Sequence, residues 1–137
     1  MNAPGTGILD TNAVILLPRL TDPATLPNEP TITAITLAEL SAGPLVATTA
    51  AECAARQAHL QQAEADFDPL PFDAAAARAF GGVAADLRAA GRKSSTRAYD
   101  ALIAAIAISV DLPLHTTNPD DFMGIRGLRV IAVAQPD

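Results

Sequence analysis

The sequence predicts an α/β fold in which a short parallel sheet is flanked by helices. Short apolar runs alternate with longer helical patterns along the 137 residues, and this alternation is typical of parallel α/β proteins. Half of the residues are hydrophobic, which is enough for one core and argues against disorder. The length suits one domain of ordinary size. We therefore expect residues 1–137 to form a single domain.

Four short runs have the composition of buried strands. They are apolar or rich in β-branched residues and are bounded by polar residues, glycine or proline. The predicted strands are Gly7–Leu9, Thr31–Ala34, Leu112–Thr116 and Leu128–Val133. The proline-rich stretch Thr21–Pro30 predicts a loop between the first helix and the second strand.

Helical patterns occupy most of the remaining chain. The predicted helices are Thr11–Leu20, a segment from Thr36 to Gly43, Leu45–Ala65, Ala74–Ala90 and Tyr99–Val110. Pro44 suits the first turn of a helix, so the second and third helices are expected to form a helical hairpin. Asp73 is an N-cap for the fourth helix, and Gly91 stands just past its end. The last helix is almost entirely apolar and should be buried on most sides.

The charge and the single cysteine restrict the class of protein. The net charge is −6 and Cys53 is the only cysteine, so an intrachain disulfide is excluded and a reducing compartment is expected. The N-terminus lacks the basic region of a signal peptide. The apolar run Ala101–Ile108 is too short to cross a bilayer. We expect a soluble, cytoplasmic protein with no membrane partner.

Two acids near the N-terminus each have a structural and a functional explanation. Asp10 directly follows the first predicted strand, and aspartate at that position is also a good N-cap for the helix after it. Glu39 stands three residues after Thr36, which matches the capping-box pattern. It is also expected in the first helical turn after a strand, at the carboxyl end of the sheet.

Two further acids lie in the C-terminal half. Asp100 precedes the most apolar helix, where capping and the helix dipole are one explanation and a shared metal ion is another. Asp121 follows a predicted strand within "TTNPDDF", where Asn118 is a candidate cap and Pro119 a first helical residue. Of the neighbouring pair Asp120 and Asp121, we expect Asp121 to point inward because it adjoins Phe122.

The joint placement of these acids is more informative than any one of them. Asp10, Glu39 and Asp121 follow predicted strands, and ligands of parallel α/β sheets bind at the carboxyl ends of the strands. Four carboxylates in one pocket repel one another unless a cation is present. Oxygen ligands favour Mg²⁺ or Mn²⁺, and the corresponding chemistry is attack of water on a phosphodiester.

Basic residues cluster just before Asp100. Four of the nine Lys and Arg residues lie within ten positions: Arg88, Arg92, Lys93 and Arg97. They are candidates for contacts with phosphates of a nucleic acid. The alternative is a solvated helix face, since Arg88 and Arg92 are four residues apart.

Four segments resemble the PIN-domain ribonucleases in order and spacing. They are "ILDTNAVILL", "TITAITLAELSAGP", "YDALIAAIA" and "HTTNPDDF", and "ELSAGP" resembles in particular the VapC-type toxins of toxin–antitoxin pairs. The resemblance covers nearly the whole chain and implies a PIN-like three-layer fold. It also implies that Asp10, Glu39, Asp100 and Asp121 are the catalytic and metal-binding acids.

The resemblance further implies a function and partners. It assigns supporting polar roles to Asn12, Thr116 and Asn118, although many members have serine where this chain has Asn12. It implies a Mg²⁺- or Mn²⁺-dependent endoribonuclease that cleaves RNA, forms a homodimer and is neutralised by a cognate antitoxin protein. The leaving group would be a 3′-oxygen.

Two other functions compete with a nuclease. A phosphatase of the haloacid-dehalogenase type needs a second aspartate two residues after the first, and here that residue is Asn12. A non-catalytic, dimeric interaction module on a PIN-like fold is the second alternative, with the alanine-rich helices as its interface. Addition of Mg²⁺ or Mn²⁺ should not change the stability of such a module.

Overall fold

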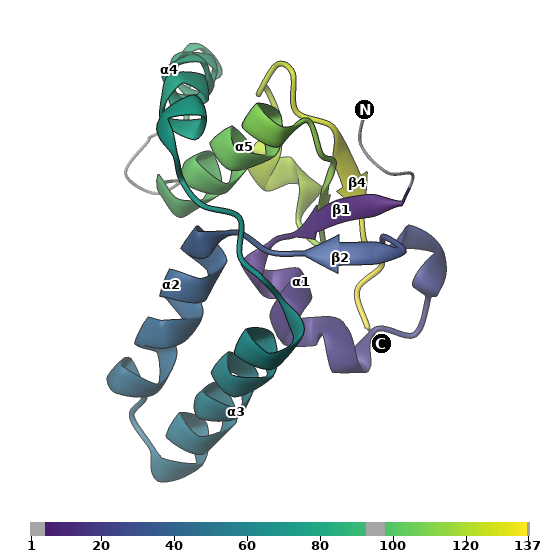
Figure 1. The fold of residues 1–137 in the computed structure, drawn as a ribbon, viewed down its shortest axis with the longest axis vertical. Helices are drawn as coiled ribbons and strands as arrows, with labels where there is room; N and C mark the ends of the chain where they lie inside the picture. The colour runs from purple at the N-terminus through teal and green to yellow at the C-terminus, as the bar shows by residue number, and fades with distance from the viewer. Residues whose placement is uncertain (1–4, 93–97, 137) are drawn as a thin grey trace.

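A four-stranded parallel sheet forms the centre of the protein (Figure 1). The computed structural model describes residues 5–92 and 98–136. The strands are β1 (Thr6–Leu9), β2 (Glu29–Thr31), β3 (Leu114–Thr116) and β4 (Val130–Ala132). They pair in the order β2-β1-β3-β4, and every neighbouring pair is parallel. The predicted parallel α/β architecture is thereby confirmed.

Five α-helices are described around this sheet. They are α1 (Thr11–Leu16), α2 (Ala34–Ala42), α3 (Ala50–Asp66), α4 (Ala74–Ala89) and α5 (Ala98–Val110). Short 3₁₀ turns cover Leu17–Arg19, Pro23–Thr25, Gly43–Val46 and Pro119–Phe122. Helices α2 and α3 form the predicted hairpin, which projects from the sheet in Figure 1. The part of the chain described contains no helix that is both long and apolar enough to cross a membrane.

Several element boundaries differ from the sequence prediction. The first helix ends at Leu16, not Leu20, and a 3₁₀ turn that contains Pro18 follows it. The second strand covers residues 29–31, not 31–34. Pro30 is tolerated within it because β2 is an edge strand, where a missing N–H leaves no partner unpaired. The third helix begins at Ala50, not Leu45, because Thr49 provides the N-cap by accepting a hydrogen bond from the N–H of Glu52. Pro44 instead lies at the start of a separate 3₁₀ turn, Gly43–Val46.

The core consists of two clusters on opposite faces of the sheet. Side chains alternate along β1, so Ile8 and Leu9 are both fully buried but belong to different clusters. The Ile8 cluster includes Ile103 of α5 and Leu87 of α4. Burial of an isoleucine of this kind contributes roughly 1.5–3 kcal/mol. The two clusters hold helices against both faces and leave the carboxyl edge of the strands for polar residues.

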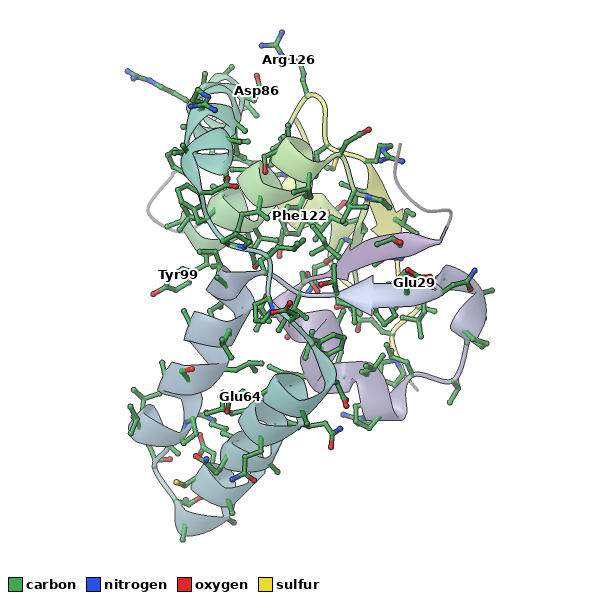
Figure 2. All side chains as sticks on the ribbon, in the orientation of Figure 1. Glu29, Glu64, Asp86, Tyr99, Phe122 and Arg126 are labelled. Atoms are coloured by element: carbon green, nitrogen blue, oxygen red, sulfur yellow. The ribbon has the colours of Figure 1, made fainter. Side chains whose placement is uncertain are left out.

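An ion pair fastens the loop after the last 3₁₀ turn to α4. Asp86 is buried at 8% exposure and accepts hydrogen bonds from the backbone N–H of Arg126 at 2.9 Å and from its Nε at 3.0 Å. The Nη2 atom of Arg126 lies 2.9 Å from the same carboxylate. Figure 2 shows the two labelled side chains next to each other at one end of the molecule. These hydrogen bonds hold the pKa of Asp86 below its ordinary value.

Substitution of Asp86 by asparagine should reduce stability at neutral pH and flatten its dependence on acid pH. A lowered pKa means that the folded state favours the ionised carboxylate. Its contribution is therefore fully present above the unfolded-state value of about 3.9 and is lost as pH falls through the lower folded value. Denaturation midpoints measured from about pH 2 to 7 test this. Asp68→Asn, at an exposed position, is the control, and parallel curves for wild type and Asp86→Asn would contradict the prediction.

Candidate active site

One open cavity of ≈ 250 Å³ contains all four predicted acids. Its lining residues come from segments far apart in the sequence: Asp10, Thr11, Asn12, Ile15, Glu39, Asp100, Asn118 and Asp121. Asp10 follows β1, Glu39 belongs to α2, Asp100 lies in the first turn of α5 and Asp121 lies in the 3₁₀ turn after β3. The structure thus brings the acids together at the carboxyl edge of the sheet, where sites of parallel α/β proteins form.

Asp10 is both a helix cap and a wall of the cavity. Its Oδ1 accepts a hydrogen bond from the N–H of Ala13 at 2.9 Å, and its Oδ2 accepts one from Thr116 Oγ1 at 2.5 Å. The residue is buried at 6% exposure. Burial raises the pKa of Asp10 and outweighs these two hydrogen bonds, which lower it, while the nearby charge of Asp121 raises it further. A cation in the cavity would offset this cost of ionisation.

Replacement of Asp10 by asparagine should raise the thermal midpoint in metal-free buffer at neutral pH. A raised pKa means that ionisation of Asp10 destabilises the folded state as pH rises above about 3.9. Asparagine removes that charge and caps a helix equally well. Thermal unfolding with EDTA measures the effect. Asp73→Asn is the matched control, because Asp73 caps α4 through a 3.0 Å bond to the N–H of Ala76 at an exposed position. Asp73→Asn should not raise the midpoint, and a midpoint of Asp10→Asn at or below that of the wild type would refute the prediction.

Glu39 does not belong to a capping box, and this sequence prediction was wrong. The N-cap of α2 is Thr33, whose hydroxyl accepts the N–H of Thr36 at 3.3 Å. The helix therefore begins two residues earlier than predicted, and Glu39 lies in its second turn. Its Oε1 instead accepts a hydrogen bond from Thr11 Oγ1 at 2.7 Å. Because the single hydroxyl proton of Thr11 goes to Glu39, Thr36 Oγ1 must be the donor in its 2.9 Å contact with Thr11.

Residues after β3 complete the opposite side of the cavity. Thr116 is fully buried, donates to Asp10 and accepts the backbone N–H of Asn118 at 3.0 Å. Asn118 precedes the 3₁₀ turn, but its side chain makes no capping hydrogen bond and lines the cavity instead. Within that turn, Asp121 lines the cavity while Asp120 is exposed. Asn12 adds an exposed amide at the rim.

The donor set of the cavity suits a hard, partly hydrated cation. Across residues 5–92 and 98–136, no three His, Cys, Asp or Glu side chains converge closely enough to enclose a metal ion by themselves. Mg²⁺ retains several waters in proteins and commonly takes only one or two carboxylates directly. The carboxylate and amide oxygens that line the cavity therefore fit Mg²⁺ or Mn²⁺, with the remaining acids acting through bound water.

Two of the four predicted basic residues can be placed. Arg88 is exposed on α4, and Arg92 donates from Nη2 to the backbone carbonyl of Asp120 at 2.7 Å. Arg92 therefore ties the end of α4 to the turn that carries Asp121. Neither arginine is among the described lining residues of the acidic cavity. Lys93 and Arg97 lie outside the described residues.

Sequence reasoning missed two residues that organise the site. Thr11 lines the cavity and bonds to Glu39, and Thr36 is fully buried beneath it. Both threonines lie where the sequence predicts the first residue of a helix, so neither was considered as a site residue. The position of Thr11 directly after Asp10 could have indicated its role, because hydrogen-bonding groups next to metal-ligand acids often orient those acids.

A parallel sheet with an acidic cavity at its carboxyl edge places this protein among the α/β proteins with a candidate metal-dependent site. Comparison with known proteins gives the family: the PIN domain model matches residues 8–127, and the chain belongs to the PIN-domain family. It is 37% identical over 132 residues to Ribonuclease VapC5 of Mycobacterium tuberculosis, with 95% of each chain covered.

Solved structures agree with this assignment. VapBC-5 of Mycobacterium tuberculosis, a member of the VapBC family of toxin–antitoxin systems, superposes with a TM-score of 0.81 at 36% identity, covering 95% of this chain and 100% of that chain. A DNA-bound VapBC from Salmonella typhimurium gives a TM-score of 0.71 at 24% identity, covering 95% and 98%. The second match supports the fold alone. The resemblance to VapC-type PIN domains inferred from the sequence is confirmed.

Proposed function

We propose that this protein is a divalent-metal-dependent endoribonuclease that acts as a toxin and is neutralised by a cognate antitoxin. The observation that carries the proposal is the single cavity that contains Asp10, Glu39, Asp100 and Asp121. The relative from Mycobacterium tuberculosis is named a ribonuclease, which favours this function over a non-catalytic interaction module. A module without catalysis has no need for an acidic cavity in which one carboxylate is costly to ionise.

The four acids would hold Mg²⁺ or Mn²⁺, with hydroxyl groups fixing two of them. Thr116 orients Asp10 and Thr11 orients Glu39 through the hydrogen bonds described above. When bound, the metal would lower the pKa of a water and stabilise negative charge on the phosphate. One carboxylate would take the proton of the attacking water as general base while the water oxygen bonds to phosphorus. The bond from phosphorus to the 3′-oxygen would break, and the 3′-oxygen would take up a proton from solvent. Asn12 and Asn118 line the cavity, and their amides would donate to phosphate oxygens.

The proposal includes partners and a compartment. A solved relative is named as a toxin–antitoxin system, which supports a protein antitoxin as the partner of this chain. We propose a homodimer in the cytoplasm, with RNA as substrate. The phosphate contacts proposed from the sequence are Arg88, Arg92, Lys93 and Arg97. The guanidinium of Arg92 already donates a hydrogen bond to the backbone carbonyl of Asp120. Arg88 is therefore the more accessible of these two arginines for a phosphate contact.

Cleavage of a labelled RNA by the purified chain, with and without metal, tests the proposal. We expect cleavage with Mg²⁺ or Mn²⁺, loss of cleavage with excess EDTA and recovery when metal is restored. The products should carry a 5′-phosphate and a 3′-hydroxyl, because the 3′-oxygen is the leaving group. Cleavage that continues in EDTA would reject the metal dependence. A chain that neither cleaves RNA nor changes its thermal midpoint with metal would be the interaction module instead.

A further inference from the structure

A second cavity adjoins the acidic cavity and shares part of its wall. It measures ≈ 250 Å³ and is lined by Thr11, Ile15, Glu39, Leu40, Gly43, Arg56 and His59. Thr11, Ile15 and Glu39 line both cavities. A nucleotide whose phosphate lies over the acidic cavity therefore has its neighbouring groups directly beside this second space.

The second cavity has apolar walls and a polar end. Ile15 of α1 and Leu40 of α2 provide the apolar surface, whereas Arg56 and His59 come from α3. Its volume falls below the range of about 300–1,000 Å³ that drug-sized ligands occupy. Apolar walls with a few directed hydrogen-bonding groups at one end suit one flat heterocyclic ring.

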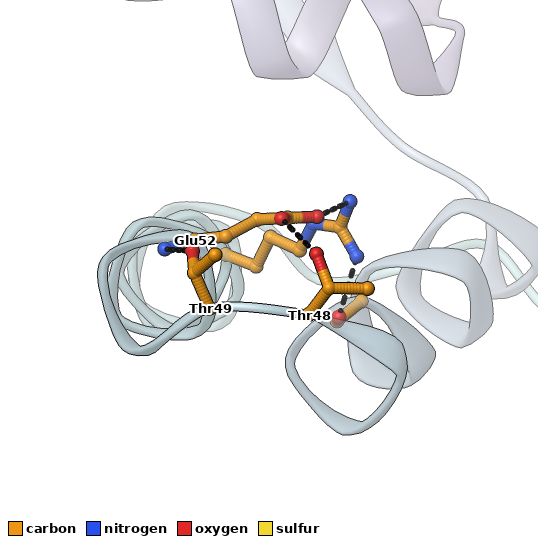
Figure 3. A network of polar contacts seen from close by, with 5 residues as sticks. Thr48, Thr49 and Glu52 are labelled. Atoms are coloured by element: carbon orange, nitrogen blue, oxygen red, sulfur yellow. Dashed lines mark hydrogen bonds and ion pairs between the residues drawn. The ribbon is translucent and has the colours of Figure 1, made fainter.

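Two contacts orient Arg56 at the polar end. Its Nη1 donates to the backbone carbonyl of Gly43 at 3.0 Å, and its Nη2 forms an ion pair with Glu52. Glu52 is itself fixed by a 3.1 Å hydrogen bond from Thr48 Oγ1, and Figure 3 shows its carboxylate at the centre of this network. Gly43 permits the close approach, because a Cβ atom there would lie 3.3 Å from Cδ of Arg56.

The charge balance favours a neutral ligand over a phosphate. Glu52 compensates the charge of Arg56, and Glu39 adds negative charge to the shared wall. The guanidinium has more N–H groups than its two contacts engage, so it can still donate hydrogen bonds into the cavity. A fixed, planar guanidinium is the group that most often recognises guanine, through the acceptors O6 and N7.

We propose that this cavity binds the base of the nucleotide next to the scissile phosphate, and that Arg56 selects guanine there. The inference rests on the proposed ribonuclease function and adds a sequence preference to it. The face of the base would pack against Ile15 and Leu40, and Arg56 would donate hydrogen bonds to the acceptors at its edge. A side chain of a protein partner is the competing occupant.

Cleavage of an RNA pool with a randomised central segment tests the preference. Sequenced products of the wild type should show guanine enriched beside the cleaved bond by roughly ten- to a hundred-fold. Arg56→Ala should lose this enrichment. Arg56→Lys, which keeps the charge without the planar fork, should also lose most of it. Arg78→Ala, an exposed arginine on α4, is the matched control and should keep the wild-type pattern. Wild-type cleavage without base preference, or a preference that survives in Arg56→Ala, would overturn the inference.

Binding of free nucleosides separates this inference from the proposed function. Guanosine and cytidine are neutral, so the acidic cavity does not repel them, and binding can be followed by NMR titration without cleavage. We expect guanosine to bind more tightly than cytidine to the wild type and to Asp10→Asn, and Arg56→Lys to lose the difference. Thermal midpoints confirm that the variants are folded.

The two assays give distinct outcomes. Arg56-dependent guanosine binding in a protein that cleaves no RNA would support the base site and reject the ribonuclease. Cleavage of RNA together with equal, Arg56-independent binding of both nucleosides would reject the base site and leave the ribonuclease standing. A cavity that binds neither nucleoside would likewise reject the base site.

Discussion

Asp10→Asn is expected to reduce metal-dependent RNA cleavage by at least about 100-fold, because a metal ion supplies several kcal/mol of charge stabilisation in such reactions and each 1.36 kcal/mol is tenfold in rate. Asp10 is the most buried of the four acids, and Thr116 fixes its orientation. Asparagine keeps the shape and the cap but removes the charge that, in the proposed mechanism, would bind the cation. The fold should therefore survive while activity is lost. Single-turnover cleavage rates with saturating Mn²⁺, together with circular dichroism, measure both.

A neighbouring aspartate provides the control for this experiment. Asp120 lies in the same turn as Asp121 but is exposed and is not among the lining residues of the cavity. Asp120→Asn should therefore cleave at close to the wild-type rate. A rate for Asp10→Asn within a few-fold of that control would mean that Asp10 is only a helix cap. The candidate active site would then have to be abandoned.

Gly7→Ala is expected to destabilise the protein by about 1–3 kcal/mol or more, as overpacking of a core typically does. A Cβ atom at Gly7 would lie 2.5 Å from Nε2 and 2.6 Å from Cδ2 of His115. The imidazole cannot easily withdraw, since it is buried at 5% exposure and its Nδ1 lies 2.8 Å from the carbonyl oxygen of Thr25. Chemical denaturation of Gly7→Ala measures the loss.

A second variant isolates the contact. His115→Ala removes the imidazole, so Gly7→Ala should cost much less in the His115→Ala background than in the wild type. This double-mutant cycle should give a coupling energy of about 1 kcal/mol or more. Equal costs in both backgrounds would show that the imidazole is not what Gly7 accommodates. The remaining close neighbour is Pro27, whose Cβ atom would lie 3.0 Å from the added Cβ.

Local sequence patterns identified the elements of the fold where one interaction dominates. The sequence predicted Asp73 as the N-cap of α4, and in the structure its side chain accepts a hydrogen bond from the N–H of Ala76. The burial of α5 follows from its composition, because a helix with no polar face must be covered on most sides. Both features depend on residues close together in the chain.

Local patterns failed where two neighbouring residues compete for the same role. Thr33 and Thr36 are both good caps, and the capping-box spacing to Glu39 favoured the second. The structure uses Thr33, which also pairs with Leu70 as an isolated parallel bridge. In this bridge the N–H of Leu70 donates to the carbonyl of Ile32, and the N–H of Ala34 donates to the carbonyl of Leu70. That bridge joins segments 37 positions apart (70 − 33), so no local pattern contains it.

The sequence by itself determined the class of fold and the set of four acids, because each acid stands beside an element whose type its neighbours specify. Only the tertiary structure decided the pKa of Asp10 and the hydrogen-bond partners of these acids. Burial and the charge of Asp121 raise the pKa of Asp10, and Thr11 reaches Glu39 across 28 positions. Arg56 lines a cavity next to the acids, although the sequence predicted its helix only as one half of a helical hairpin. Distances and burial between remote segments arise from packing, and a linear pattern does not contain them.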